Sequence, residues 1–553
     1  MIKYTLSTQN FEQHFLDILC EIPVGDQNQI EVQLPAWRPG RYELGNFAKN
    51  IQSFEIYNEK NEPLKFHKIT KDRWVVNCGD CEKVFINYNY YAVDFNAGST
   101  YVGEDVLYVN PVNCFVYVDE LIDQPFEVEV PMTSNQQLVC GLKSEGNKLI
   151  AHDFHQLVDA PFIVSSQIQV KQYESNNITF YVWFYGECKP EWDKILNDFK
   201  RFTNYQIEQF GGFPVSEYHF MNIIHPYATY HGVEHHNSTV ITLGPSYDVF
   251  DKLYTEFLGV SSHELYHTWN IKNIRPKEMM PYNYAKENYS RLGYVAEGVT
   301  TYMGDLVLFE SGVFDKKQYA KEFTSYLTRH FTNDGRLNMS VADSSFDTWL
   351  DGYEMGIPDR KSSIYTEGAL LAFLVDVEIR KLSNDKKSLH DVIKLLYERF
   401  GKVGEGYTEK DYLDTVKEVS ESDFIHSFYE TYIAEANDLT QLLKEGLDYM
   451  NLTLTIEPSN NATNRVGLKG INEKDGSYKV VHVKEDSTAY QAGLSREDYV
   501  LAINNIKLSS NFDQWLNYFK EDQVELTVVR NSMTRKVLLG NENENQFFSY
   551  KVS

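Results

Sequence analysis

One short segment organises this chain, and it reads Ser262-His263-Glu264-Leu265-Tyr266-His267-Thr268-Trp269-Asn270. His263 and His267 are four residues apart, so a helix with 3.6 residues per turn places both imidazoles on one face. Two neutral imidazoles arranged in this way can reach one Zn²⁺ ion at roughly 2.0–2.1 Å. The Glu264 carboxylate follows the first imidazole, where it can meet a water molecule beside the ion. The H-E-x-x-H pattern therefore predicts a zinc-binding helix.

The residues around the motif decide between a metal site and ordinary packing, because most histidine pairs on helices bind nothing. Phe257, Leu258, Val260 and Leu265 predict an apolar helix that buries the motif. Burial of two imidazoles and a carboxylate without a partner costs free energy. The flanking sequence therefore favours metal binding.

A catalytic zinc ion needs a third protein ligand and one open position. Three downstream acids are candidates: Glu278 lies in a proline-bounded loop, Glu287 in a polar stretch, and Glu297 in the otherwise apolar helix predicted over 294–303. A carboxylate on an apolar helix needs a partner, which a zinc ion would supply. We therefore expect Glu297 to be the third ligand. Because Glu297 lies thirty positions after His267, a loop must be inserted between the two helices.

The bulk composition excludes several classes of protein. The chain has 553 residues, a length typical of about three domains. Its net charge of −27 argues against nucleic acid and against an anionic membrane surface as partners. No apolar run is long enough to span a membrane. The first residues predict a strand rather than a signal peptide, and six cysteines do not form a disulfide framework, so we expect a cytoplasmic protein.

Three domains are predicted, over residues 1–170, 171–450 and 451–545. The first is an all-β, sandwich-like domain, because short β-branched and aromatic runs alternate with turn residues. These runs are 4–7, 30–34, 74–77, 84–91, 115–118 and 126–130. Within this domain, Leu34-Pro35-Ala36-Trp37-Arg38-Pro39-Gly40-Arg41-Tyr42 predicts a rigid loop. We expect this loop to pack between domains rather than to bind a ligand.

The middle domain changes from alternating strands to helical periodicity. Residues 192–210 predict a helix, 220–224 a buried strand, and Gly232 to Leu243 an edge strand that faces a cleft. Further helices are predicted over 317–333 and 365–382, and Ser388-x-x-Asp391 and Thr408-x-x-Asp411 predict helix starts. The whole chain is therefore a multidomain α+β protein with a mainly helical metal-binding domain.

The last domain follows a helix predicted over 438–453. Its pattern of strands and short helices, with Ala489-x-x-Ala492-Gly493-Leu494 followed by Asp498-x-Val500-Leu501-x-Ile503-Asn504, resembles PDZ domains. Such domains accept an extended peptide as an added strand. A domain that only packs on its neighbour is an equally good interpretation, and self-association is a further candidate.

A family resemblance emerges from several separated motifs. The segment His263 to Pro276, the sequence Val295-Ala296-Glu297-Gly298, the 34–42 loop, Gly232-Val233-Glu234-His235 and the PDZ-like end together resemble the glycyl aminopeptidase family of gluzincin metallopeptidases. The resemblance implies a thermolysin-like catalytic domain with zinc on His263, His267 and Glu297. It also implies removal of N-terminal residues from peptides, with glycine or alanine favoured.

Two further roles are implied by similarity to aminopeptidase motifs. Gly232-Val233-Glu234-His235 is similar to a G-x-M-E-N motif whose glutamate binds the free α-amine, and here His235 stands where asparagine is usual. Tyr365-Thr366-Glu367-Gly368 is similar to a Y-x-K-G motif whose tyrosine stabilises the oxyanion, with Glu367 in place of the lysine.

The predicted function is peptide hydrolysis by a zinc-activated water, with Glu264 as general base and Tyr365 as oxyanion donor. The expected substrates are peptides with a free N-terminus. One rival interpretation is an endopeptidase whose substrates are captured by the PDZ-like domain. Another is a non-catalytic peptide-binding or chaperone module. An epoxide hydrolase on the same scaffold has no distinct feature in this sequence to support it.

Overall fold

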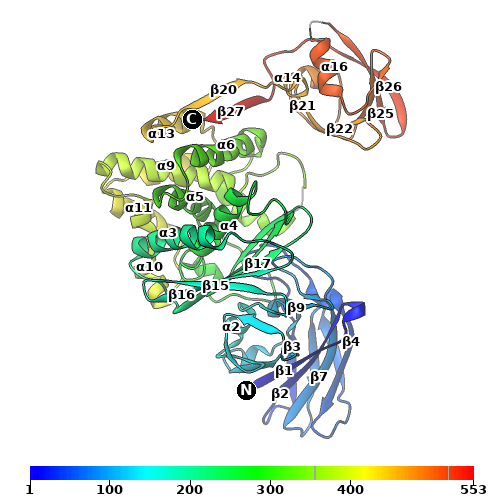
Figure 1. Cartoon of the computed structure of the whole chain (residues 1–553), viewed down its shortest axis with the longest axis vertical. Helices are drawn as coiled ribbons and strands as arrows, with labels where there is room; N and C mark the ends of the chain where they lie inside the picture. Colours follow the sequence, from blue (N-terminus) through cyan, green and yellow to red (C-terminus); the bar gives the residue numbers. More distant parts are fainter. Residues whose placement is uncertain (354–355, 521) are drawn as a thin grey trace. The chain divides into compact units, whose positions relative to one another are not determined.

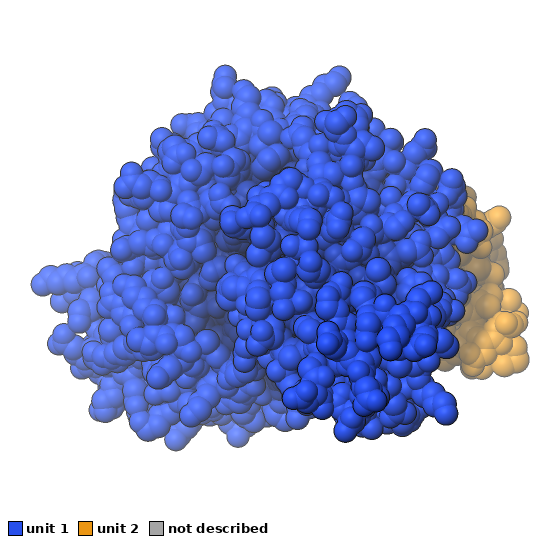
Figure 2. All heavy atoms as spheres, turned by 90° about the horizontal axis from the view of Figure 1, so that it is seen from below, with its two compact units in different colours: residues 1–319, 334–439 blue, residues 320–333, 440–553 orange. Residues whose placement is uncertain are grey.

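The computed structural model describes residues 1–353, 356–520 and 522–553. The chain forms two compact units, which are coloured separately in Figure 2. Unit 1 comprises residues 1–319 and 334–439, and unit 2 comprises residues 320–333 and 440–553. Each unit is described by itself.

Unit 1 begins with β-sheets that enclose one hydrophobic core (Figure 1). The largest of these has seven strands in the order β12-β13-β10-β1-β2-β7-β4. Its strands are β1 (Ile2–Asn10), β2 (Phe15–Pro23), β4 (Ile51–Asn58), β7 (Lys83–Tyr91), β10 (Phe126–Glu129), β12 (Lys143–Glu145) and β13 (Lys148–Ala151). On β2 and β7 buried residues alternate with more exposed ones, as expected for strands with one face on a core.

Two smaller sheets complete the β-rich part, which confirms the predicted all-β domain. One contains β11 (Gln137–Cys140), β14 (Phe162–Ser165), β9 (Val106–Val109) and β8 (Tyr101–Val102), and the other β3 (Gln29–Gln33), β6 (Arg73–Asn77) and β5 (Phe66–Thr70). The strand predicted over 115–118 is wrong. Those residues are buried but irregular, after the short helix α1 (Pro111–Cys114), and only Tyr117 forms an isolated bridge, with Gln33. Their apolar character reflects burial rather than strand pairing.

The next sheet has five strands in the order β15-β16-β17-β19-β18. They are β15 (Gln169–Ser175), β16 (Ile178–Tyr185), β17 (Glu217–Ile224), β18 (Thr229–Glu234) and β19 (Ser238–Gly244). Strands β16, β17 and β19 run parallel, and every residue of β19 is buried, as in a sheet covered on both faces. The single edge strand predicted over 232–243 is therefore wrong in part. The chain turns after Glu234, so only β18 lies at the edge, and β19 is an inner strand.

Helices pack on this sheet and on one another (Figure 1). Those of unit 1 with at least ten residues are α3 (Trp192–Phe210), α4 (Tyr254–Tyr266), α5 (Thr300–Glu310), α9 (Thr366–Ser383), α10 (Leu389–Arg399) and α11 (Glu409–Ser420). Shorter helices are α2 (Phe154–Val158), α7 (Val341–Phe346), α8 (Thr348–Asp351) and α12 (Phe424–Phe428). Capping boxes at Ser388 and Thr408 start α10 and α11, as predicted.

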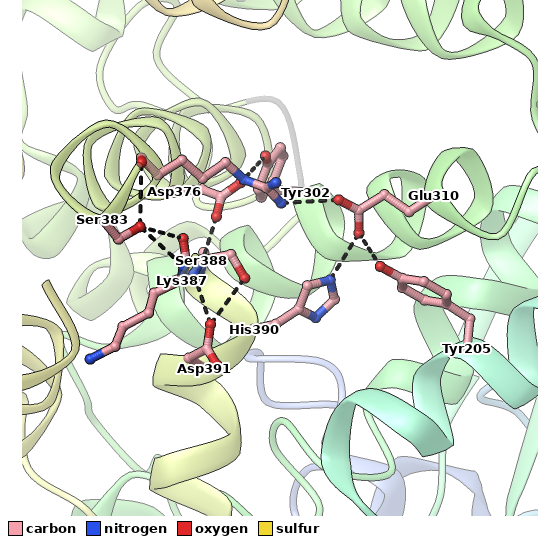
Figure 3. Close-up of polar contacts among 11 residues, drawn as sticks. Tyr205, Tyr302, Glu310, Asp376, Ser383, Lys387, Ser388, His390 and Asp391 are labelled. Carbon is pink, nitrogen blue, oxygen red and sulfur yellow. Dashed lines mark hydrogen bonds and ion pairs between the residues drawn. The ribbon is translucent and has the colours of Figure 1, made fainter. Parts of the chain in front are cut away.

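A buried polar network connects four of these helices (Figure 3). Asp376 on α9 accepts hydrogen bonds from Tyr302 on α5 at 2.7 Å and from Arg380 at 2.8 Å. Arg380 also donates to Glu310 at the end of α5, at 3.0 Å. Glu310 in turn accepts from Tyr205 on α3 at 2.6 Å and lies 3.2 Å from the ring nitrogen of His390 on α10. These contacts connect α3, α5, α9 and α10 with one another.

Unit 2 contains a PDZ-like sheet and the helices and strands that lead to it. Helix α6 (Lys316–Thr332) begins in unit 1 and continues in unit 2, and α13 (Thr440–Tyr449) precedes the strand pair β20 (Leu454–Pro458) and β27 (Phe548–Val552). The PDZ-like sheet has β21 (Leu468–Asn472) at one edge, then β22 (Tyr478–Val483), β23 (Tyr499–Ile503), β25 (Val524–Arg530) and β26 (Met533–Leu539), with β24 (Ile506–Lys507) beside β23. Helices α14 (Ala462–Arg465), α15 (Thr488–Gln491) and α16 (Phe512–Tyr518) accompany it.

Further observations bear on the sequence predictions. None of the helices among the described residues is long and apolar enough to cross a membrane. All six cysteines are free thiols, and Cys78 and Cys81 close a tight turn through a backbone hydrogen bond of 3.3 Å. The domain boundaries at 170/171 and 450/451 stay predictions.

Candidate metal centre

Helix α4 brings the two motif histidines together at its C-terminal end. His267 is the C-cap residue, and its backbone N–H donates to the carbonyl of His263 at 3.2 Å. The two Nε2 atoms lie 3.0 Å apart. Nδ1 of His267 lies 2.7 Å from the backbone carbonyl oxygen of Asn270, which can only accept a hydrogen bond. Nδ1 therefore carries a proton, and Nε2 of His267, which faces His263, is the nitrogen left to bind a metal ion.

Glu297 reaches this histidine pair from the next helical segment. It lies in η5 (Tyr294–Val299), a π-helical turn that continues into α5. Its Oε2 atom lies 3.4 Å from Nε2 of His267 and 3.9 Å from Nε2 of His263. The Asn270 side chain donates to the Val295 carbonyl at 2.9 Å and so connects the two segments. The loop predicted between them occupies residues 268–292, whose only helix is the short η4 (Lys277–Met279).

The donor set fits a zinc ion. Two ligand atoms about 2.1 Å from one tetrahedral ion lie about 3.4 Å apart, close to the spacings in this cluster. Two facing imidazole lone pairs repel each other unless a proton or a metal cation lies between them. His263, His267 and Glu297 form one group of ligand atoms that could hold a metal ion, all within 4.8 Å of one another. Two imidazoles and one carboxylate are a donor set typical of catalytic zinc sites.

Two more carboxylates lie next to the histidines. Glu234, Glu264 and His267 form a second group whose ligand atoms also lie within 4.8 Å of one another. Glu234 and Glu264 are 4% and 5% exposed, and Oε1 of Glu234 and Oε2 of Glu264 have no hydrogen-bond partner among the described residues. Buried carboxylate oxygens without a partner indicate that a cation or a hydrogen-bond donor is missing.

Electrostatics in the cluster favour positive charge. Burial by itself would lower the pKa of His267, but the Glu297, Glu234 and Glu264 carboxylates outweigh this effect and raise it to about 10. Burial, assisted by the charge of His267, lowers the pKa of His263 well below its usual value, so that imidazole is neutral. Burial also raises the pKa of Glu264. A metal cation would supply the positive charge that this carboxylate-rich cluster otherwise takes from a proton.

The edge strand β18 runs directly alongside Glu264. A Cβ atom at Gly232 would overlap the Glu264 carboxylate and would lie 2.8 Å from a methyl group of Val260. Glycine is therefore required for space at this position rather than for its backbone angles. Two residues further on, Glu234 ends the strand and faces Gly40, where a Cβ would lie 2.5 Å from its Oε2 atom.

Tyr365 lies at the N-terminus of α9, and its hydroxyl is 3.1 Å from that of Tyr353. Burial raises the pKa of Tyr365 well above its usual value, and the Glu297 carboxylate raises it further, so the hydroxyl stays protonated and can donate. Gly368 and Gly298 bring α9 close to η5, because a Cβ on Gly368 would lie only 2.8 Å from the Cα atom of Gly298. This close crossing brings Tyr365 and Glu297 into one site.

The loop over residues 34–42 has a larger role than the predicted one. It packs as expected, with Nε1 of Trp37 donating to the Asn283 carbonyl at 2.7 Å. However, it also enters the site, where the Tyr42 hydroxyl donates to Oε1 of Glu297 at 2.9 Å. Arg38 is 5% exposed and lies 3.2 Å from Nε2 of His231 on β18. Sequence reasoning missed Tyr42 and Arg38, although the rigidity of the loop was a usable signal.

Comparisons with known proteins agree with this geometry. The Peptidase M61 N-terminal domain family matches residues 3–166, the M61 glycyl aminopeptidase family matches residues 256–371, and a PDZ domain family matches residues 479–530. No curated protein matches the chain.

Solved structures extend the comparison. An aminopeptidase N family protein from Idiomarina loihiensis is 25% identical with a TM-score of 0.92, covering 100% of this chain and 98% of its own. An M1 zinc metallopeptidase from Deinococcus radiodurans is 12% identical with a TM-score of 0.49, covering 79% of this chain and 93% of its own.

The two-histidine, one-carboxylate cluster on this fold and the family matches together define a zinc metallopeptidase. Within that class, the chain belongs to the M61 glycyl aminopeptidase family. The predicted multidomain fold with a C-terminal PDZ domain is confirmed.

Proposed function

We propose that this zinc peptidase is an aminopeptidase that removes small N-terminal residues, glycine or alanine, from peptides. His263, His267 and Glu297 would hold the zinc ion. Glu264 would act as general base, Tyr365 would donate to the oxyanion, and Glu234 would bind the substrate's α-ammonium group beside Gly232.

The chemistry divides between the ion and the side chains. A zinc ion in such a site acidifies water and polarises a carbonyl oxygen. The Glu264 carboxylate would accept the proton of the attacking water at its unpaired Oε2 atom and pass it to the leaving amine. The protonated hydroxyl of Tyr365 would donate to the oxygen of the scissile carbonyl as negative charge develops there.

The observation that carries the aminopeptidase proposal is the Glu234 carboxylate. It is buried at the end of the edge strand, and its Oε1 atom has no hydrogen-bond partner among the described residues. An α-ammonium group supplies the missing positive charge and hydrogen bond, whereas an internal peptide bond offers no charge there. Ligand atoms of Glu234 and Glu264 lie within 4.8 Å of each other. An ammonium group bound by Glu234 would therefore place the first peptide bond of the substrate beside Glu264.

The residues directly after Glu234 support an exopeptidase. His235 lies 3.2 Å from the Asp159 carboxylate, which also accepts from the backbone of His236 at 2.9 Å and from Lys272 at 2.7 Å. His235, Asp159 and Lys272 are buried or nearly so. A substrate continuing past Glu234 would have to displace these mutually satisfied side chains. This arrangement favours a chain end over a longer peptide segment.

The preference for a small first residue is supported by crowding and by the family. Gly40 lies against Glu234, and Tyr42 lies against Glu297, so the 34–42 loop limits the space beside the α-ammonium position. The matching family is described as glycyl aminopeptidase.

The test compares cleavage of glycine anilide and alanine anilide with cleavage of the same two anilides after N-acetylation. The wild-type enzyme should cleave free-amine substrates and spare N-acetylated ones. Glu234→Ala should raise KM for alanine anilide by at least about tenfold, because a charge-assisted hydrogen bond is lost. Glu217→Ala, on the exposed start of β17, is the matched control and should change little. Equal cleavage of free and acetylated peptides would instead indicate an endopeptidase.

The PDZ domain is proposed to bind an extended peptide along β21, which has a neighbouring strand on one side only in its sheet. Titration of the full chain with a labelled peptide would test this proposal. Sedimentation of the chain alone would detect self-association through the same edge.

A further inference from the structure

A cavity of about 780 Å³ lies within unit 1, where the β-rich part meets the loop that follows α4. This volume is in the range of small-molecule binding sites. None of the residues that line it is among the proposed zinc ligands or catalytic residues. Its lining includes Lys272 and Arg275, from the part of the sequence motif that the proposed hydrolysis does not use.

Arg275 is the notable residue of this cavity. Its side chain is half-buried, and its guanidinium group lies over the ring of Tyr282, 3.9 Å from the ring centroid. Two of its nitrogen atoms donate to backbone carbonyls, of Ile271 at 3.3 Å and of Lys272 at 3.1 Å. Among the described residues, no carboxylate oxygen lies within 4.0 Å of it. The guanidinium group is thus held rigidly by neutral partners and lacks an anion.

The other charged groups of the cavity do not fill this role. Lys272 is already paired with Asp159 at 2.7 Å. Asp153 caps helix α2 by accepting from the backbone of Gln156, and Glu405 is not within 4.0 Å of Arg275. Lys277 also lines the cavity, and it is exposed. An anionic ligand would therefore find at Arg275 a guanidinium group that has no carboxylate oxygen of the described residues within 4.0 Å.

The rest of the lining sets the chemistry of the remainder of the ligand. Leu142, Val158, Ala160, Met280 and Pro281 supply apolar wall. The Tyr284 hydroxyl and Nδ1 of His155, which are 2.9 Å apart, add a polar edge. A rigid arginine at one side of an apolar cavity suits a carboxylate attached to an apolar or aromatic body.

We propose that this cavity is a second ligand site, separate from the zinc centre, which binds the carboxylate of a small apolar or aromatic molecule through Arg275. An amino acid or short peptide with a free carboxyl end and a simple organic acid share this chemistry. The site adjoins the Asp159–Lys272 pair, whose Asp159 also contacts His235 next to Glu234. The ligand is not required to be a substrate, so the site is independent of the proposed aminopeptidase activity.

The experiment uses the full-length, zinc-loaded chain and isothermal titration calorimetry. The probe is N-acetyl-L-phenylalanine, which has no free amine, and its amide is the matched probe without a carboxylate. We expect the acid to bind at least about tenfold more tightly than the amide, because only the acid can form a charge-assisted hydrogen bond. 3-Phenylpropionate distinguishes a simple organic acid from a peptide carboxyl end as the ligand. Binding equal to that of N-acetyl-L-phenylalanine assigns the site to organic acids in general, and weaker binding assigns it to peptide carboxyl ends.

Variants then locate the binding. Arg275→Gln should weaken binding of the acid by at least about tenfold and leave the amide unchanged. Lys277→Gln, which removes the exposed cation of the lining, should weaken binding of the acid by a smaller factor. Arg291→Gln, at an ion pair with Asp343 away from the cavity, should have no effect. The proposal is overturned if acid and amide bind equally, if the acid shows no binding at about 10 mM, or if neither cavity variant changes its affinity.

Discussion

The Tyr42 hydroxyl donates a hydrogen bond of 2.9 Å to Oε1 of Glu297, across 255 positions of sequence. The other carboxylate oxygen, Oε2, is the one that faces both histidines. A loop of the β-rich part therefore determines which oxygen of the third proposed ligand is presented to the ion. Partners of this kind orient metal ligands and commonly change metal affinity by about 10–100-fold.

Tyr42→Phe should lower the affinity for zinc by about 10–100-fold, because Glu297 loses its fixed orientation. Zinc affinity would be measured by competition with a chelator, which does not depend on turnover. Tyr108→Phe is the matched control, because it removes a buried tyrosine hydroxyl bonded to the Ala97 carbonyl in the same β-rich part. Equal zinc affinity in the two variants would show that the Tyr42 contact does not position Glu297.

Glu264→Gln should retain one zinc ion per chain while lowering kcat by at least about 10²-fold, because an amide cannot accept the proton. Metal content and hydrolysis of alanine anilide would be measured on the same preparation. His267→Ala should lose both the metal and the activity. Loss of the metal would distinguish His267, as a metal ligand, from Glu264, as a general base. Substantial activity in Glu264→Gln would remove this residue from the mechanism.

Gly232→Ala should lower kcat by about tenfold or more, because its methyl group would overlap the Glu264 carboxylate and displace it. Gly259→Ala is the control within α4, since the nearest atom to its added Cβ is 3.7 Å away, and it should leave kcat unchanged. Wild-type kinetics in Gly232→Ala would mean that the strand can move away without consequence. Steady-state kinetics with thermal unfolding as a check on folding would decide between these outcomes.

Tyr365→Phe should lower kcat by about 10²–10³-fold with little change in KM, because an oxyanion donor acts mainly in the transition state. Tyr353→Phe removes the neighbouring hydroxyl, 3.1 Å away, and should have the smaller effect. The reverse order of effects would transfer the oxyanion role to Tyr353.

Glu310 makes stability depend on pH through the network in Figure 3. Burial alone would raise the pKa of Glu310, but His390, Tyr205 and Arg380 outweigh this effect and lower it to about 2. An unfolded glutamate titrates near about 4.3, so the ionised carboxylate contributes about 3 kcal/mol above that pH. This contribution is lost as pH falls from about 4.3 toward 2, because protonation removes the charge that the folded state favours.

Glu310→Gln should therefore destabilise the metal-free protein at pH 7, and its deficit relative to wild type should shrink at about pH 3. Thermal unfolding at both pH values would measure this. Glu418→Gln, at an exposed ion pair with Arg399, should cost little at either pH. A deficit for Glu310→Gln that is the same at both pH values would contradict the assigned pKa.

Local periodicity explains why much of the site could be predicted. His263 and His267 lie on one helical face because their spacing matches the helix repeat, and Glu297 is predicted as a ligand because a carboxylate on an apolar segment needs a partner. The structure brings these three side chains within reach of one another. The capping boxes at Ser388 and Thr408 were equally visible, since each is a short-range hydrogen-bond pattern.

Sequence alone thus determined the metal-binding helix, the β-rich start and the PDZ domain, because helix repeat, strand alternation and turn residues are local properties. Tertiary structure alone decided that Tyr42 reaches Glu297 and that the chain turns after Glu234 to make β19 an inner strand. It also decided that Arg275 lines a cavity with no carboxylate oxygen of the described residues within 4.0 Å of its side chain. These features depend on the packing of segments far apart in the chain. Residue spacing cannot predict such long-range contacts, because they form only when separate layers bury their apolar faces against one another.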